Sequence, residues 1–186
     1  MRVLKDILYK VAIESVTGST AVGVKKIHFD SRLISVQDVF VAIEGETADG
    51  HAFIEAAVAR GANVVVCEEL PSEVIPDESY IQVKDCREAL AVMASNYYDN
   101  PSANLKLIGV TGTNGKTTVC SLLYQMFKVL GYKVGLISTV VIKVDDKDYS
   151  TKLTTPDSLT INSYLKEMNE VGVEFCFMEV SSHGIA

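Results

Sequence analysis

The feature that most constrains the fold is a glycine-rich segment, GVTGTNGKTT, at residues 109–118. It follows an apolar run at 105–110 and precedes a stretch at 116–130 whose apolar residues have helical spacing. Glycines at 112 and 115 let the backbone curl so that successive N–H groups face one anion, and the helix start favours phosphate there. The segment therefore predicts a phosphate-binding loop between a buried strand and a helix.

The side chains of this segment fit nucleotide chemistry. Lys116 can reach the β- and γ-phosphates as a point charge, and Thr117 can place its hydroxyl on Mg²⁺. The strict G-x-x-x-x-G-K-[ST] pattern needs glycine at position 110, where this chain has Val110, so the loop is a variant. The alternative is a strand–helix turn that binds no ligand. Such a turn rarely has the sequence G-x-x-G-K-T-T between a strand and a helix.

The elements after the loop predict a parallel α/β domain. We expect a strand at 133–137, a hairpin at 140–152 around an Asp-Asp pair, a helix at 158–171 and a strand at 175–180. Strand, helix and strand in succession form a right-handed parallel unit. Ligands bind at the carboxyl ends of such strands. Since the sequence ends six residues after the last expected strand, we expect an incomplete domain from a larger protein.

The preceding residues predict a smaller α/β domain, whose strand order the pattern leaves open. The polar stretch 96–106 marks the boundary, giving expected domains at 1–100 and 105–186. The strands expected in the first domain are 38–43, 62–67 and 80–84, and its helices are 52–60 and 86–98.

Glu179 stands at the end of an apolar strand, where a nucleotide enzyme places a carboxylate partner for Mg²⁺. The alternative is an ordinary glutamate facing solvent. The cluster Ser181–His183 follows it and could bind substrate or metal. A Ser–His nucleophilic pair is weakly supported there, because adjacent residues rarely face each other and no orienting acid is assigned.

Three further segments have both a structural and a functional interpretation. Thr154–Asp157 is a turn before a helix, with Asp157 or Ser158 as the N-cap, or a pair of hydroxyls aimed at the same cleft. The segments 30–32 and 45–51 are typical of turn chemistry when judged from the residues alone. His28 and His51 are then structural or surface residues.

Composition excludes several function classes. The chain has 186 residues, 48% of them apolar and 22% charged, which is globular, and its formal charge of −7 disfavours general binding to nucleic acids or anionic membranes. No secretory signal and no apolar run near the ~18 residues of a membrane span is evident, so we expect a cytoplasmic protein. The cysteines are far apart and predict reduced thiols rather than zinc ligands or disulfides; they are Cys67, Cys86, Cys120 and Cys176.

Taken together, four stretches resemble the Mur ligases, the ATP-dependent amino-acid-adding enzymes of peptidoglycan synthesis. The stretches are HFDSRLISVQDVFVAIEGETADGHAFIEAAVARGA at 28–62, GVTGTNGKTT at 109–118, LTTPD at 153–157 and MEVSSHGIA at 178–186. The loop is shared with folylpolyglutamate synthases, whereas the other stretches resemble the diamino-acid-adding branch more specifically. The resemblance implies a small N-terminal α/β UDP-binding domain, followed by the first part of a P-loop, parallel-sheet ATPase domain.

The resemblance also implies roles for individual residues. Ser31 and the loop around His51 would contact the UDP part of a sugar nucleotide, and Thr154, Thr155 and Ser182 would contact its muramoyl-peptide part. Lys116 and Glu179 would act in catalysis, with Thr117 and Glu179 as Mg²⁺ ligands. The implied ATP-binding residues are Gly112, Thr113, Asn114, Gly115, Lys116, Thr117 and Thr118.

The activity that the resemblance implies is formation of an amide through an acyl phosphate. The expected substrates are ATP, UDP-N-acetylmuramoyl-L-alanyl-D-glutamate and a diamino acid, with meso-2,6-diaminopimelate favoured over L-lysine. The family's later substrate and metal contacts and its amino-acid-binding domain are absent from this sequence, so we expect the chain to be inactive alone. The alternatives are another Mur-type or folylpolyglutamate-synthase-like ligase, and a non-catalytic nucleotide-binding module.

Overall fold

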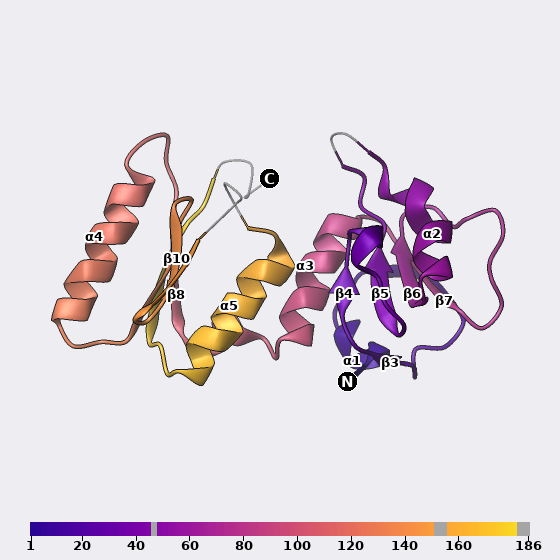
Figure 1. Cartoon of the computed structure of the whole chain (residues 1–186), viewed down its shortest axis with the longest axis horizontal. Helices are drawn as coiled ribbons and strands as arrows, with labels where there is room; N and C mark the ends of the chain where they lie inside the picture. Colours follow the sequence, from indigo (N-terminus) through magenta and orange to yellow (C-terminus); the bar gives the residue numbers. More distant parts are fainter. Residues whose placement is uncertain (46–47, 151–155, 182–186) are drawn as a thin grey trace. The chain divides into compact units, whose positions relative to one another are not determined.

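The computed structural model describes residues 1–45, 48–150 and 156–181, which are arranged in two compact units, Met1–Tyr97 and Tyr98–Ala186 (Figure 1). Each unit has its own five-stranded sheet. In the described part of the chain, no helix combines the length and the apolar character needed to cross a bilayer.

The first unit is a mixed sheet in the order β2-β7-β6-β5-β4, with a small antiparallel pair β1-β3 beside it. Strands β4 to β7 are parallel to one another, and β2 is antiparallel to β7. The elements are β1 (Arg2–Val3), α1 (Leu4–Ile7), β2 (Ile13–Thr17), β3 (Gly23–Val24), β4 (Ile27–His28), η1 (Ser31–Leu33), β5 (Asp38–Val41), η2 (Gly50–Phe53), α2 (Ile54–Ala59), β6 (Ala62–Cys67), β7 (Ser79–Val83) and α3 (Cys86–Tyr97).

The central strands of this unit are mostly apolar because both faces of the sheet are covered. Phe40, Val65 and Tyr80 point to the face that packs against α2, in a buried cluster with Ile54. The residues that alternate with them are also buried, and α3 lies on the opposite side of the sheet from α2 (Figure 1). This is the burial expected of parallel strands with helices on both faces.

The second unit contains the glycine-rich loop, and its sheet has the order β11-β10-β9-β12-β8. Strands β8, β12 and β9 are parallel, whereas β10 and β11 form an antiparallel hairpin at one edge. The elements are η3 (Pro101–Asn104), β8 (Lys106–Val110), α4 (Lys116–Val129), β9 (Val134–Ile137), β10 (Val141–Val144), β11 (Lys147–Ser150), α5 (Ser158–Glu170) and β12 (Phe175–Glu179).

Helices α4 and α5 lie on opposite faces of this sheet (Figure 1). Cys120 of α4 shares a buried cluster with Val134, Leu136 and Phe177, and α5 packs on the other face through a cluster that includes Leu165. The predicted strands and helices of this unit are confirmed, with ends that shift by at most one residue. The predicted hairpin is confirmed as far as Ser150, and its last two residues lie outside the described part of the chain. The pattern did not indicate that β12 lies between β8 and β9.

Two expectations for the first unit need correction. The expected helix at 52–60 is a 3₁₀ turn, η2, followed by a shorter α-helix, α2, and the expected strand at 38–43 ends at Val41. In η2, the Asp49 carboxylate accepts the N–H of His51 and holds the tighter turn. The four cysteines are free and buried.

Candidate functional site

The glycine-rich loop connects the carboxyl end of β8 to the first turn of α4. Gly112 and Gly115 have φ angles of 146° and 80°, in the region that favours glycine. A Cβ on Gly115 would meet nothing within 4 Å, so there is space for a side chain at this position. Glycine is favoured there because of the positive φ angle. Gly115 also N-caps α4, whose first N–H groups have no acceptor within the helix. The loop therefore presents backbone donors and the positive end of a helix, as an anion site requires.

Lys116 lies across this loop. Its ammonium donates a hydrogen bond to the carbonyl of Gly112 at 2.7 Å, so the positive charge is held beside the curled backbone. The loop residues from Thr111 to Gly115 are exposed to solvent. A phosphate approaching the loop would therefore meet the lysine, the amides and the helix start together.

Glu179 reaches the same place because β12 is paired directly with β8. In the parallel register Glu179 lies opposite Val110, the last residue before the loop, and the N–H of Val180 donates to the Val110 carbonyl at 2.9 Å. The Glu179 side chain accepts a hydrogen bond from the Thr117 hydroxyl at 3.0 Å and one from the Thr139 N–H at 3.4 Å. Glu179 is 7% exposed, so the alternative of a solvent-facing glutamate is wrong.

The partners of Glu179 suit a divalent cation. In the described residues, no lysine or arginine forms an ion pair with this buried carboxylate, and buried charges are usually paired or bound to metal. One carboxylate and one hydroxyl beside a phosphate site are the protein ligands that Mg²⁺ typically takes. The described residues contain no group of three histidine, cysteine or acidic side chains, the set that an all-protein metal site would need.

Cys120 lies one turn into α4, close enough to Glu179 to feel its charge. Burial, and to a lesser degree Glu179, raises the pKa of the Cys120 thiol to about 11. A raised pKa favours the protonated thiol, which is the less nucleophilic form.

The second candidate region lies at the carboxyl edge of the first unit's sheet. Strands β4 and β5 are parallel, and the segments that follow them contain Ser31 and His51. Asp30 caps the η1 turn by accepting the Arg32 N–H at 3.0 Å, and it also binds the Arg32 guanidinium at 2.7 Å. The hydrogen bonds from Arg32 lower the Asp30 pKa to about 2. The segment 30–32 is thus a self-contained turn that presents Ser31 at this edge.

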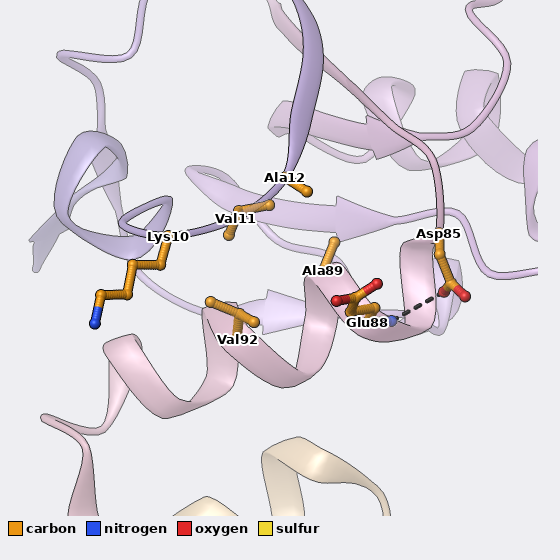
Figure 2. A pocket seen from close by; sticks show the side chains of 7 residues that line it. All are labelled: Lys10, Val11, Ala12, Asp85, Glu88, Ala89 and Val92. Carbon is orange, nitrogen blue, oxygen red and sulfur yellow. Dashed lines mark hydrogen bonds between the residues drawn. The ribbon is translucent and has the colours of Figure 1, made fainter. Parts of the chain in front are cut away.

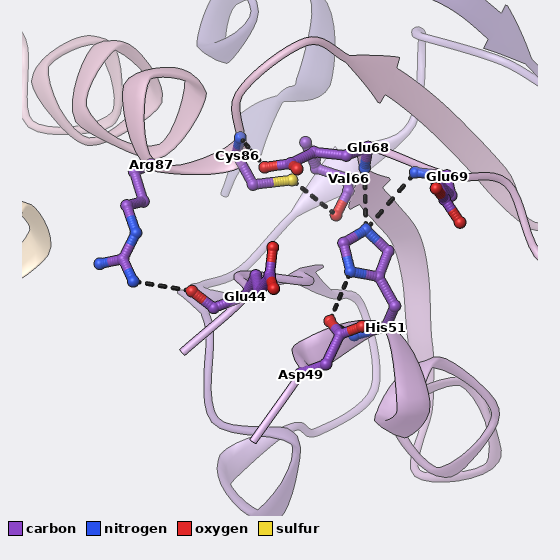
Figure 3. Close-up of polar contacts among 8 residues, drawn as sticks. All are labelled: Glu44, Asp49, His51, Val66, Glu68, Glu69, Cys86 and Arg87. Carbon is purple, nitrogen blue, oxygen red and sulfur yellow. Dashed lines mark hydrogen bonds and ion pairs between the residues drawn. The ribbon is translucent and has the colours of Figure 1, made fainter. Parts of the chain in front are cut away.

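His51 has a structural role, which is one of the two interpretations that the residues alone allowed (Figure 3). Its Nε2 accepts the N–H of Glu68 at 3.0 Å, so Nδ1 carries the proton and donates to Asp49 at 2.7 Å. The neutral ring therefore fastens the loop after β5 to the end of β6, and both of its nitrogens are already used. The signal for this role was the Asp-Gly-His sequence, in which Asp49 caps the turn that contains His51.

Two contacts with α3 extend this fastening (Figure 3). The Arg87 guanidinium donates to the Glu44 carbonyl at 2.7 Å, and the Glu68 carboxylate accepts the N–H of Cys86 at 2.9 Å. The loop after β5 is thus tied to β6 and to the start of α3. No pattern in the sequence singled out Arg87 or Glu68.

A shallow pocket elsewhere in the first unit is lined by none of the predicted site residues (Figure 2). Its polar side chains include Asp85, which caps α3 by accepting the N–H groups of Arg87 and Glu88 at 2.7 and 2.9 Å. The lining residues are Lys10, Val11, Ala12, Asp85, Glu88, Ala89 and Val92.

The remaining predicted contacts, Thr154, Thr155 and Ser182, lie outside the described residues, as does His183. Asp157 is described, and its carboxylate accepts the N–H of Thr160 at 3.0 Å and its hydroxyl at 2.6 Å. Of the two proposed N-caps of the helix, Asp157 rather than Ser158 is therefore the cap.

Comparisons with known proteins agree with this arrangement. The model of the Mur ligase middle domain matches residues 110–186, and that of the Mur ligase family catalytic domain matches residues 23–98. Curated relatives named UDP-N-acetylmuramoyl-L-alanyl-D-glutamate–2,6-diaminopimelate ligase include one from Cytophaga hutchinsonii, 52% identical over 97% of this chain, and one from Clostridium acetobutylicum, 43% identical over 98%. The chain spans 37% and 38% of those relatives' lengths.

Solved structures show a similar fold. A structure titled UDP-N-acetylmuramoyl-L-alanyl-D-glutamate–2,6-diaminopimelate ligase matches 99% of this chain with a TM-score of 0.77 and 23% identity, and the match covers 37% of its own chain. The MurF ligase from Thermotoga maritima, solved in complex with ADP, matches 85% of this chain with a TM-score of 0.53 and 23% identity, covering 32% of its own chain. With both units matched by models of the same family and with curated relatives at this level of identity, the chain belongs to the Mur ligase family.

Proposed function

We propose that this chain forms the nucleotide-sugar-binding and phosphate-binding parts of an ATP-dependent ligase. The reaction would join 2,6-diaminopimelate to UDP-N-acetylmuramoyl-L-alanyl-D-glutamate, the two compounds that the names of its relatives give. We expect the meso form of the diamino acid. The observation that carries the proposal is the hydrogen bond between Thr117, directly after the loop lysine, and the buried Glu179. This pairing of a loop hydroxyl with a strand-end carboxylate is the arrangement that P-loop enzymes use beside the nucleotide phosphates.

The proposed reaction has two steps. A substrate carboxylate attacks the γ-phosphorus of ATP, the bond to the β-phosphate oxygen breaks, and an acyl phosphate and ADP form. The amine of the diamino acid then attacks the acyl carbon, inorganic phosphate leaves, and the amine loses a proton. The first step brings several anions together, so the site must offset negative charge.

The residues of the loop fit this requirement. The Lys116 ammonium and the amides around Gly112 and Gly115 would hold the β- and γ-phosphates. Thr117 and Glu179 would be the protein ligands of Mg²⁺, which when bound supplies positive charge at those phosphates. Their separation by a single hydrogen bond of 3.0 Å supports a shared cation site at this end of the sheet.

The first unit, Met1–Tyr97, lies within the domain predicted at residues 1–100 and would bind the UDP part of the substrate. Ser31 lies in a turn held by Asp30, and of the segment after β5, Glu44 is bonded to α3 and His51 to the end of β6. Such preformed loops at the carboxyl edge of a parallel sheet are typical of ligand sites. Because the His51 ring nitrogens are engaged, its predicted contact to uridine would come through the loop that it holds.

A cytoplasmic location is part of the same proposal. Its support is the need for ATP and for a nucleotide sugar, and the four cysteines that remain free thiols.

Replacing Lys116 tests the nucleotide site. We expect Lys116→Ala to weaken ATP binding to the 186-residue chain at least tenfold, measured by calorimetry, because it removes the charge held over the loop. Lys128→Ala is the matched control: Lys128 is on the same helix, paired with Asp145 and Asp146 away from the loop, and its loss leaves ATP affinity unchanged. Equal affinity in the Lys116 variant and the wild type would refute the assignment.

The ligase reaction needs a separate test. In a protein that joins this chain to the remaining length found in the relatives, we expect ATP-dependent formation of the diaminopimelate-containing product, detected by mass spectrometry, and none with Lys116→Ala. If the joined protein used L-lysine in preference to diaminopimelate, the proposed diamino acid would be wrong. Nucleotide binding without product from any diamino acid would favour the non-catalytic module.

A further inference from the structure

The turn between β9 and β10 is closed by the side chain of Ser138, which is 3% exposed. The Ser138 hydroxyl donates to the carbonyl of Val141 at 2.8 Å and accepts the N–H groups of Val140 and Val141 at 3.3 and 3.1 Å. The Ser138 N–H donates to the same Val141 carbonyl at 3.1 Å. A hydroxyl has one donor and two acceptor positions, so this one is fully used in fixing the turn.

This turn lies directly beside Glu179. Strand β9 is paired in parallel with β12, with Ile137 opposite Met178, so the turn begins where Glu179 ends its strand. The turn residue Thr139 directs its N–H at Glu179 Oε1, 3.4 Å away, while the Thr117 hydroxyl donates to Oε2 at 3.0 Å. The two carboxylate oxygens are therefore held from opposite sides, one by the turn and one by the first turn of α4.

We propose that Ser138 is a positioning residue for Glu179. By fixing the turn, it keeps the Thr139 amide on Oε1 and so leaves Oε2 facing Thr117 and a divalent cation at the nucleotide phosphates. Residues that orient a metal-binding carboxylate in this way usually change metal affinity about 10- to 100-fold when they are removed. The inference rests on the proposed function, since it concerns the cation at that same site.

The test separates the cation from the nucleotide. The dissociation constant of ATP for the 186-residue chain is measured with excess Mg²⁺ and again with EDTA. The value in EDTA divided by the value in Mg²⁺ reports the cation's contribution to ATP affinity. We expect Ser138→Ala to reduce this ratio about tenfold while the affinity in EDTA stays within about twofold of the wild type. Ser138→Thr keeps the hydroxyl, and we expect its ratio to equal that of the wild type.

A matched control shows whether the effect is only a loss of stability. Ser163 in α5 also donates its hydroxyl to a backbone carbonyl, that of Thr160, at 2.8 Å, and it lies on the helix opposite α4. Ser163→Ala loses one hydrogen bond of the same kind and leaves the Mg²⁺ ratio unchanged. If Ser138→Ala does not fold, Ser138→Cys keeps the volume with a weaker donor and gives a smaller reduction of the ratio.

The outcomes distinguish this inference from the function on which it rests. A Ser138→Ala ratio equal to the wild type, or an equal loss of affinity with and without Mg²⁺, overturns the positioning role while the nucleotide site stands. A wild-type chain whose ATP affinity does not depend on Mg²⁺ overturns the cation site and the positioning role together. A wild-type chain that does not bind ATP overturns the proposed function as well.

Discussion

Two buried acids show how side-chain partners separate a structural residue from a candidate ligand. Asp38 is 2% exposed and accepts the N–H groups of Lys26 and Ser35 at 3.1 and 2.9 Å, with His28 3.7 Å away. Glu179 is similarly buried, but it accepts one hydrogen bond from the Thr117 hydroxyl and only a long contact from the Thr139 N–H. Among the described residues, Glu179 therefore has fewer hydrogen-bond donors at ordinary distance than Asp38. The sequence placed Glu179 at a strand end, but only the structure shows how these acids differ.

Asp30 gives a prediction about acid stability. Its pKa in the folded chain is lowered from 3.8 to about 2 by hydrogen bonds from Arg32, so its contribution to stability is present above pH 3.8. That contribution is lost as the pH falls through about 2, since the unfolded state then binds the proton at a higher pH than the folded state. We expect Asp30→Asn to flatten the decline of the unfolding free energy between pH 4 and 2. Urea unfolding across this range is the measurement, and an unchanged slope contradicts the role.

At the scale of elements, strong local signals were predicted well and non-local pairing was not. The central strands β6 and β12 and helices α3, α4 and α5 have long apolar patterns, and all were predicted. Strands β1, β3 and β4 have two residues each, too few for any periodicity. The insertion of β12 between β8 and β9 is fixed by tertiary packing between distant segments. That insertion sets Glu179 against the loop, so the sequence identified both parts of the site but not their contact.

Helix α4 is bounded by two glycines that test the loop separately from the helix. Gly115 precedes the helix with a φ of 80°, and Gly131 follows it with a φ of 89°. At the end of the helix, the N–H of Gly131 donates to the carbonyl of Lys128, and the N–H of Tyr132 donates to the carbonyl of Phe127. A Cβ on either glycine would meet nothing within 4 Å. Alanine at either position therefore costs only the strain of the left-handed backbone, about 1–2 kcal/mol of unfolding free energy.

We expect Gly115→Ala and Gly131→Ala to lower the unfolding free energy by similar amounts, measured by urea denaturation. Only Gly115→Ala should also weaken ATP binding, because it alone alters the curl of the phosphate-binding loop. Equal ATP affinities in the two variants would show that the backbone at position 115 does not contribute to nucleotide binding.

At the scale of the whole chain, the two units divide the proposed work. Each has its own sheet and its own buried clusters, one around Phe40 and Tyr80 and two on the faces of the second sheet. The fastened loop at His51 belongs to the first unit, and the phosphate loop with Glu179 belongs to the second. A unit that buries its own apolar surface can bind a ligand in its folded state and be stabilised by it.

This division predicts separate responses to the two nucleotides. We expect UDP to shift the amide resonances of Ser31 and of Glu68, whose N–H donates to His51, because these lie at the carboxyl edge of the first sheet. ATP with Mg²⁺ should instead shift those of Gly112 to Thr118 and of Thr139, whose N–H points to Glu179. Heteronuclear NMR of the labelled 186-residue chain is the measurement, with inorganic phosphate as a control for simple anion binding. The contrary outcome is that UDP shifts only the amide resonances of the loop in the second unit. The phosphates of UDP would then be bound by the ATP loop, and the proposal that the first unit binds the nucleotide sugar would be wrong.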